Sequence, residues 1–208
     1  MAPRRPPLFQ AHPWHGISPG PDAPDEVTAY IEIVPNESVK YELHKESGHL
    51  RVDRPQRLSS ICPTLYGFIP QTFCDREVAR FSQACAGRAG IVGDGDPLDI
   101  CVVTEKAIAH GGFLLRARPI GGLRLLDKNE ADDKVISVLV DDVTYGEVTE
   151  LDHLPPALVD RIRHYFLTYK DLPEPGWERT CEITDVYDAA TAREVVRRAM
   201  ADYVAAYP

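Results

Sequence analysis

A succession of short strand-like segments is the sequence feature that most limits what this chain can fold into. Runs of β-branched and aromatic residues alternate with turn residues, and they cover residues 29–34, 38–43, 50–53, 100–104, 112–126 and 135–140. Short strands separated by tight turns favour antiparallel pairing. Pro119 and the pair Gly121-Gly122 are expected to break the longest segment, because proline cannot donate to a sheet and glycine weakens it.

Two helices are expected towards the end of the chain. Apolar residues recur at helical spacing between residues 156 and 170, at Leu158, Ile162, Tyr165, Phe166 and Tyr169. A second helix is expected to begin near Thr191, because Thr191-Ala-Arg-Glu194 has the form of a capping box. Strands followed by helices predict an α+β fold, with a small closed antiparallel β-barrel, similar to an OB fold, and flanking C-terminal helices.

The first 26 residues differ in composition from the rest of the chain. Seven prolines lie between Pro3 and Pro24, and proline lacks the donor that helices and sheets require. We therefore expect a proline-rich arm over residues 1–26, lying on the surface or flexible, and a single domain over residues 27–208.

Net charge and cysteine content limit the partners and the cellular compartment that we expect for this protein. The chain has 32 acidic and 23 basic side chains, a net charge of −9, whereas nucleic-acid binding depends mainly on Lys and Arg. The five cysteines are odd in number and form no CxxC pair, which indicates reduced thiols in a cytoplasmic protein. Because no apolar run approaches the ~20 residues of a membrane span, we expect neither nucleic acid nor a membrane as a partner.

The segment from Gly93 to Val102 concentrates negative charge. Asp94, Asp96 and Asp99 lie within six residues, and carboxylates this close repel one another unless a cation lies among them. Glycine and proline in the segment indicate a turn that lets the side chains converge. Oxygen ligands suit hard ions such as Mg²⁺, Mn²⁺ or Ca²⁺. A solvated acidic turn is the alternative.

An EF-hand loop is excluded at this segment. Asp94, Asp96 and Glu105 fall at loop positions one, three and twelve, but Asp99 occupies position six, where the loop needs glycine.

Charged residues two positions apart occur elsewhere in the predicted strands. Lys134 follows Asp132 at this spacing, and Glu42 follows Lys40. Residues two apart share one face of an extended segment. Such a face is either a wet outer surface with weak ion pairs or the place where a metal and a phosphate oxygen meet.

Taken in order along the chain, these segments resemble soluble inorganic pyrophosphatases of the first, barrel-forming family. The resemblance extends from Ile31 to about Leu172, and its most specific element is Asp94-Gly-Asp96-Pro-Leu-Asp99. The further matches are Glu32, Lys40-Tyr-Glu42, Val52-Asp53-Arg54, Tyr66-Gly67, Asp127, Asp132, Lys134 and Tyr169-Lys170.

The resemblance implies hydrolysis of inorganic pyrophosphate to two orthophosphates by a metal-bridged water, with Asp96 as the general base. Several Mg²⁺ ions, for which Mn²⁺ can substitute, are implied, with the ligands Asp94, Asp99, Asp127, Asp132 and Glu32. The residues implied to hold the two phosphates are Lys40, Arg54, Tyr66, Lys134, Tyr169 and Lys170, and Glu42 is implied to support them.

Four features depart from the family pattern. Cys62 stands where many relatives have tyrosine, and Lys128 stands where an acid often follows Asp127. Residues 71–93 form a longer connection, which we expect to be a surface excursion. A homo-oligomer, specifically a hexamer, is expected by resemblance, but Thr168 replaces the second histidine of the subunit contact to which His164 would contribute.

Two rival functions remain to be weighed against this one. The first is another metal-dependent phosphohydrolase, acting on nucleotides or polyphosphate, which would share the acidic cluster but need room and an aromatic platform for a base. The second is a non-catalytic barrel that binds nucleic acid or calcium. The net charge of −9 opposes nucleic acid, and the mismatched loop opposes calcium.

Overall fold

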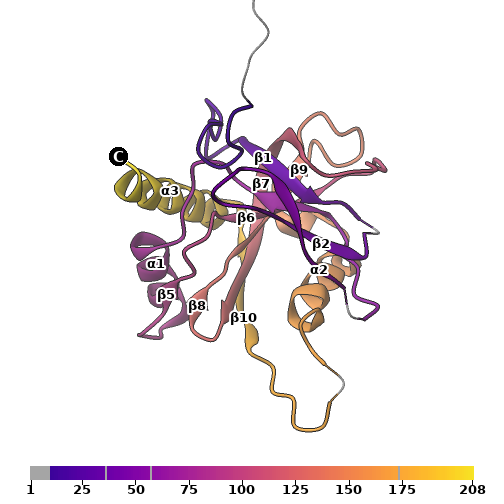
Figure 1. Cartoon of the computed structure of the whole chain (residues 1–208), viewed down its shortest axis with the longest axis vertical. Coiled ribbons are helices and arrows are strands. Elements are labelled where there is room, and N and C mark those ends of the chain that lie inside the picture. Colours follow the sequence, from indigo (N-terminus) through magenta and orange to yellow (C-terminus); the bar gives the residue numbers. More distant parts are fainter. Residues whose placement is uncertain (1–9, 36, 57, 173) are drawn as a thin grey trace, which may run out of the picture.

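Five strands close into a barrel at the centre of the molecule. The computed structural model describes residues 10–208 apart from residues 36, 57 and 173. The strand order around the barrel is β1-β4-β6-β9-β7, and β7 pairs with β1 to close the ring (Figure 1). The strands are β1 (Val27–Ile33), β4 (Leu65–Phe68), β6 (Asp99–Val103), β7 (Phe113–Asp127) and β9 (Lys134–Leu139). The predicted α+β fold with a small closed barrel is therefore confirmed.

One pairing within the barrel departs from the antiparallel arrangement predicted from the sequence. β6 and β9 are parallel, whereas the other four pairings of the ring are antiparallel. The parallel register places Asp99 opposite Lys134. The first residues of both strands therefore meet at the same end of the barrel, and this pairing brings an acid and a base together that are far apart in the sequence.

The longest strand, β7, was expected to break and does not. It runs for 15 residues through Pro119 and Gly121, and the register with β9 shifts between these two residues. A proline at a bulge need not donate to the sheet. A side chain at Gly122 would collide with the ring of Tyr187, at 2.4 Å. The prediction was wrong because these residues form a bulge and a close approach, and not a strand end.

Further strands extend the sheet beyond the barrel. β10 (Cys181–Asp188) pairs with β7, as does β8 (Glu130–Ala131), and β5 (Val92–Gly93) pairs with β8. β2 (Val39–Leu43) and β3 (Leu50–Pro55) form a separate two-stranded hairpin, and β2 crosses in front of the barrel strands in Figure 1.

Helices cover the barrel on two sides. α1 (Arg76–Ala86) and α3 (Ala189–Ala206) pack together, and Val78 and Val196 share a buried cluster with barrel residues. α2 (Pro156–Thr168), preceded by the short helix η1 (Leu151–His153), packs on a second cluster. Figure 1 shows these two helical sides apart, with the loop after α2 protruding from the barrel.

The helix starts refine the sequence prediction. α2 begins at Pro156 as expected. α3 begins at Ala189, and its cap is Asp188, whose carboxylate accepts a hydrogen bond from the Thr191 amide at 2.8 Å. The helix therefore begins two residues before the predicted start near Thr191, because an aspartate three residues before Thr191 satisfies that amide.

Residues 71–93 are more than a surface excursion. Thr72 and Cys74 are buried, and α1 lies within this segment. The described part of the proline-rich segment is also anchored, because the Trp14 side chain is 3% exposed and its indole N–H donates to the Thr72 carbonyl at 2.8 Å. None of the helices in the described part of the chain is both long and apolar enough to span a membrane.

Candidate active site

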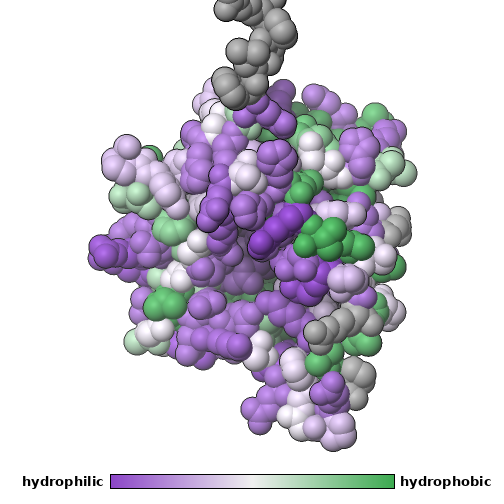
Figure 2. Space-filling view, in the orientation of Figure 1, coloured by the Kyte–Doolittle hydropathy of each residue, from purple (hydrophilic) through white to green (hydrophobic). Residues whose placement is uncertain are grey.

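A cavity of about 220 Å³ opens at the end of the barrel where β6 and β9 begin. Figure 2 shows hydrophilic side chains around a hollow in the middle of this face. Twelve of the thirteen candidate residues line the cavity; these are Glu32, Lys40, Glu42, Tyr66, Asp94, Asp96, Asp99, Asp127, Asp132, Lys134, Tyr169 and Lys170. Arg54 is not among the lining residues, so its assigned role stays a prediction.

The acidic loop between β5 and β6 forms one wall. The backbone of Cys74 holds this loop twice: its N–H donates to the Asp96 carbonyl at 2.9 Å, and its carbonyl accepts from the Gly95 N–H at 3.1 Å. A side chain at Gly93 would lie 2.2 Å from the same carbonyl, so only glycine fits there. Within the loop, the Asp96 amide donates to the Asp94 carboxylate at 3.0 Å. The segment expected to be an excursion therefore supports the loop.

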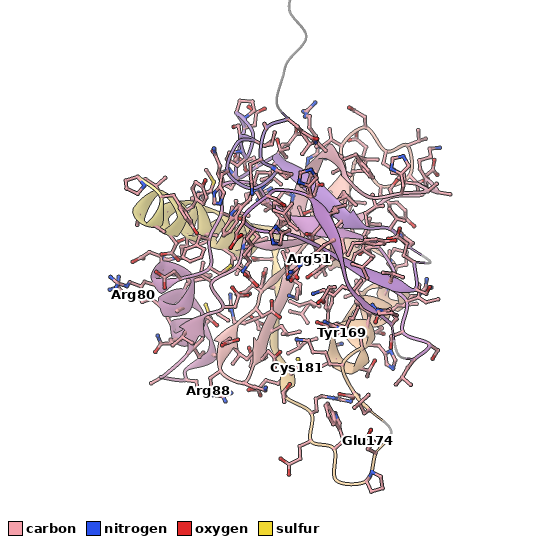
Figure 3. The ribbon with its side chains drawn as sticks, viewed as in Figure 1. Arg51, Arg80, Arg88, Tyr169, Glu174 and Cys181 are labelled. Atoms are coloured by element: carbon pink, nitrogen blue, oxygen red, sulfur yellow. The ribbon has the colours of Figure 1, made fainter. Side chains whose placement is uncertain are left out.

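An adjoining wall carries the second acidic cluster, because Gly93 of β5 pairs with Ala131 of β8. Asp127 ends β7, and Asp132 lies just before β9. Lys170, which follows α2, donates to Asp127 at 2.6 Å. Figure 3 labels the neighbouring Tyr169 near the middle of this face, and Glu174 on the protruding loop. Three parts of the sequence thus contribute to one wall.

Lys134 joins the two walls. Its ammonium group contacts both Asp99 and Asp132, and the Tyr66 hydroxyl donates to Asp99 at 2.6 Å. Burial disfavours the charge on Lys134, but the carboxylates of Asp132 and Asp99 outweigh it and raise the pKa of the ammonium above its usual value. Lys134 therefore stays protonated although it is 2% exposed.

Burial raises the pKa values of two carboxyls in the cavity, Asp94 and Asp99. Burial, followed by the charge of Asp132, raises the pKa of Asp94 to about 9. Burial also raises the pKa of Asp99, against the opposing effect of Lys134. Asp94 therefore holds a proton near neutral pH unless additional positive charge enters the cavity.

Glu32 lies where the barrel meets the β2–β3 hairpin. Its carboxylate accepts a hydrogen bond from the Leu43 amide at 2.7 Å, and burial raises its pKa to about 8 despite that bond. On the hairpin, Lys40 lies 3.1 Å from Asp53 and 3.7 Å from Glu42. Arg54 pairs with the same Asp53 at 2.7 Å, which keeps Arg54 at the edge of the site.

Six lining residues were missed by sequence reasoning. They are Trp14, Leu43, Lys45, Phe68, Pro97 and Glu130. Lys45 is the charged residue of most interest among them, because its ammonium group contacts Asp96. A single lysine in a polar turn carries no sequence signal, and only the folded hairpin brings it to the cavity.

Cys62 is buried away from the cavity lining. Its side chain belongs to the core under α2, and burial raises the pKa of the thiol to about 11. A thiol with a raised pKa is a poor nucleophile, so we do not expect alkylation of Cys62 to control the site.

The donor chemistry of the cavity fits divalent hard cations. The walls offer carboxylate oxygens, and Asp127 Oδ1 is buried without a hydrogen-bond partner among the described residues. Within the same described part of the chain, no three acidic, histidine or cysteine side chains form a ready-made metal cage. Lysines lie among the carboxylates instead, so a bound cation would compete with their ammonium groups for carboxylate oxygens.

Known proteins with similar sequences point to the same family as the sequence motifs. A family model described as inorganic pyrophosphatase matches residues 29–204. An inorganic pyrophosphatase of Chlamydia trachomatis is 50% identical over 200 residues, which cover 95% of this chain and 96% of that protein. Soluble inorganic pyrophosphatase 2 of Chlamydomonas reinhardtii is 36% identical and matches 93% of this chain and 88% of its own length.

A solved structure supports the same assignment. The crystal structure of inorganic pyrophosphatase from Thermus thermophilus superposes with a TM-score of 0.78 at 28% identity, covering 93% of this chain and 99% of that one. The sequence prediction of the family is confirmed, and the chain belongs to the inorganic pyrophosphatase family, as a hydrolase of pyrophosphate.

Proposed function

We propose that this cavity hydrolyses inorganic pyrophosphate to two orthophosphates with the help of several Mg²⁺ ions, and that Asp96 is the general base. One observation carries the proposal: carboxylates from three separate parts of the chain converge in one cavity together with lysines. Crowded carboxylates with raised pKa values favour binding of cations, and a polyanionic substrate needs cations between itself and an acidic wall.

The carboxylates divide into two groups by exposure and by role. Burial in the cavity walls raises the pKa values of Asp94 and Asp99, which suits ligands that ionise when a cation arrives. Asp96 differs, because its side chain is 45% exposed and so is open to water. When bound, divalent cations would acidify an attacking water and offset the substrate's charge. Asp96 would orient that water and accept its proton.

The basic and phenolic side chains bind the substrate in this proposal. Lys134 and Lys170 reach the cavity from β9 and from the end of α2, and Lys40 reaches it from the hairpin. Charge-assisted hydrogen bonds from ammonium groups to phosphate oxygens are stronger than neutral ones. The hydroxyls of Tyr66 and Tyr169 add donors, and Glu42 supports Lys40 at 3.7 Å.

The assembly stays a prediction. A homo-hexamer is implied by the family resemblance, and His164 is exposed on α2, as a subunit contact requires. Thr168 hydrogen bonds to the His164 carbonyl at 2.7 Å. Light scattering of the purified protein tests the mass directly.

Initial rates of phosphate release test the proposed chemistry. We expect hydrolysis of pyrophosphate with Mg²⁺, weaker support from Mn²⁺, and no turnover in excess chelator. ATP and tripolyphosphate, each assayed with the same ions, test the rival phosphohydrolase activity. Full turnover in excess chelator would contradict metal dependence, and faster hydrolysis of ATP than of pyrophosphate would contradict the proposed substrate.

A further inference from the structure

Three of the four lysines that line the cavity share one arrangement. Each ammonium group is held by a carboxylate, and the pairs are Lys134 with Asp99 and Asp132, Lys170 with Asp127, and Lys45 with Asp96. Cations that bind these carboxylates compete with the ammonium groups for the same oxygens. Metal binding would therefore free these ammonium groups to donate hydrogen bonds to the phosphate oxygens of an entering polyanion.

The backbone of Lys45 is fixed over the cavity. Lys45 lies in the turn between β2 and β3, and the His44 amide closes this turn on the His49 carbonyl at 2.8 Å. His12 donates from its ring Nε2 to the Lys45 carbonyl at 3.0 Å. A side chain at Gly48 would come within 2.9 Å of the His12 ring, so the turn sits directly on the N-terminal segment.

The Lys45 side chain, unlike its backbone, is free to reorient. It is 50% exposed, and its partner Asp96 is 45% exposed. Ion pairs at such exposure contribute little to stability, so little holds the ammonium group in place. Asp96 is its one ion-pair partner in the described part of the chain. A fixed backbone with a mobile charged tip is suited to closing on a ligand.

We propose that Lys45 is a further substrate-binding residue, which leaves Asp96 and contacts a phosphate oxygen of pyrophosphate when metal and substrate enter. The inference rests on the proposed function of the cavity. It follows from the shared arrangement, because Lys45 forms an ion pair with Asp96 just as Lys170, a proposed substrate-binding residue, forms one with Asp127. It also explains how Asp96 becomes free to accept a proton, since an ammonium group on the carboxylate competes with water for it.

Two substitutions separate charge from shape at this position. Lys45→Met keeps the length and removes the charge, whereas Lys45→Arg keeps the charge. Lys106→Met is the matched control, because Lys106 is 62% exposed, pairs with its neighbour Glu105 and does not line the cavity. The measurements are kcat and KM for pyrophosphate with Mg²⁺, and the Kd of methylenediphosphonate, a non-hydrolysable analogue, by calorimetry with Mg²⁺.

We expect Lys45→Met to raise both KM and the analogue's Kd about 10-fold, the scale of one charged hydrogen bond. Lys45→Arg should restore both to within about threefold, and the control should match the wild type. Unchanged KM and Kd in Lys45→Met would overturn the inference. A loss of kcat alone would also overturn it, since it would make Lys45 a positioning residue for Asp96. Absence of turnover in the wild type would instead contradict the proposed function.

Discussion

Two groups of partly or fully buried aspartates differ in the partners that neutralise their charge. Asp142 and Asp202 lie in the body of the fold. Asp94, Asp99 and Asp127 line the cavity. The body carboxylates are 6% and 4% exposed and accept hydrogen bonds mainly from backbone amides. The cavity carboxylates face one another and the ammonium groups of lysines. Burial alone therefore does not mark a functional acid in this protein; the kind of partner does.

Asp202 illustrates the structural arrangement. Its carboxylate accepts the amides of Asp75, Glu77 and Val78 at 2.9–3.1 Å, and so caps the first turn of α1 from the neighbouring α3. Backbone amides at a helix start cannot move away, and they favour a negative charge. A lysine can move, which makes the carboxylates it holds available to other cations.

The largest effect is expected for Asp96→Asn. The amide keeps the shape but cannot accept a proton, so kcat for pyrophosphate should fall ~100-fold or more, the usual scale for a positioned base. The free energy of unfolding should stay within about 0.5 kcal/mol of the wild type, as for an exposed site. A nearly normal kcat would show that Asp96 is not the general base, and would weaken the contrast between catalytic carboxylates in the cavity and structural carboxylates in the body of the fold.

For Asp202→Ala we expect the opposite result, a loss of stability. Three amides lose their acceptor, so the free energy of unfolding should fall by about 2 kcal/mol in denaturant titrations. Asp160→Ala, at a 70% exposed position paired with Arg163, serves as the surface control and should change stability by less than about 0.5 kcal/mol. If Asp202→Ala and the control were equally stable, the hydrogen bonds from the first turn of α1 to Asp202 would not stabilise the fold.

Magnesium should stabilise the protein more at high pH than at low pH. Glu32 and Asp94 have pKa values raised to about 8 and about 9, so the metal-free protein loses stability as pH rises from their unfolded values towards these folded ones. At lower pH, Mg²⁺ must displace protons. At tenfold excess over its Kd, Mg²⁺ should add about 1.4 kcal/mol, and thermal melts with and without chelator should show this gain shrinking as pH falls from 9 to 6. A gain that did not depend on pH would contradict protonated cavity acids.

The smallest effect is expected for Asp142→Asn. Burial opposes the charge of Asp142, but hydrogen bonds from the Thr104 hydroxyl and the amides of Tyr145, Glu105 and Thr144 outweigh it and lower the pKa. A lowered folded pKa contributes stability above the unfolded value and loses it as pH falls through the folded value. The substitution should therefore cost about 1 kcal/mol at pH 7 and less at pH ~3, because the contribution of Asp142 shrinks as pH falls from the unfolded pKa of about 3.9 towards the lowered folded pKa. Denaturant midpoints at the two pH values check this.

The barrel was predictable because its strands are runs of apolar and β-branched residues, but several other elements carried little apolar signal. β10 buries Cys181 and Tyr187 and exposes most of the residues between them, so its pattern resembled a loop. α1 buries chiefly Val78 and Ala79 among its apolar residues. The parallel pairing of β6 with β9 depends on contacts across the whole barrel, and no local pattern encodes it.

The candidate site was predicted from its acidic motifs more than from its surroundings. The spacing of Asp94, Asp96 and Asp99 predicted convergence, and these residues line one cavity. The roles of Lys45 and Cys74 depend on where a turn and a backbone segment come to lie after folding. Such contacts follow from tertiary structure, so a sequence shows them only through a family pattern that already contains them.

Trp14 gives the chain a built-in optical reporter. It is one of two tryptophans; it lines the cavity, while Trp177 is 44% exposed on the protruding loop. Indole emission responds to nearby charge, so fluorescence from Trp14 should report ions and phosphate arriving in the cavity without any attached dye. With Trp177 replaced by phenylalanine, a single emitter would follow occupancy on the time scale of mixing.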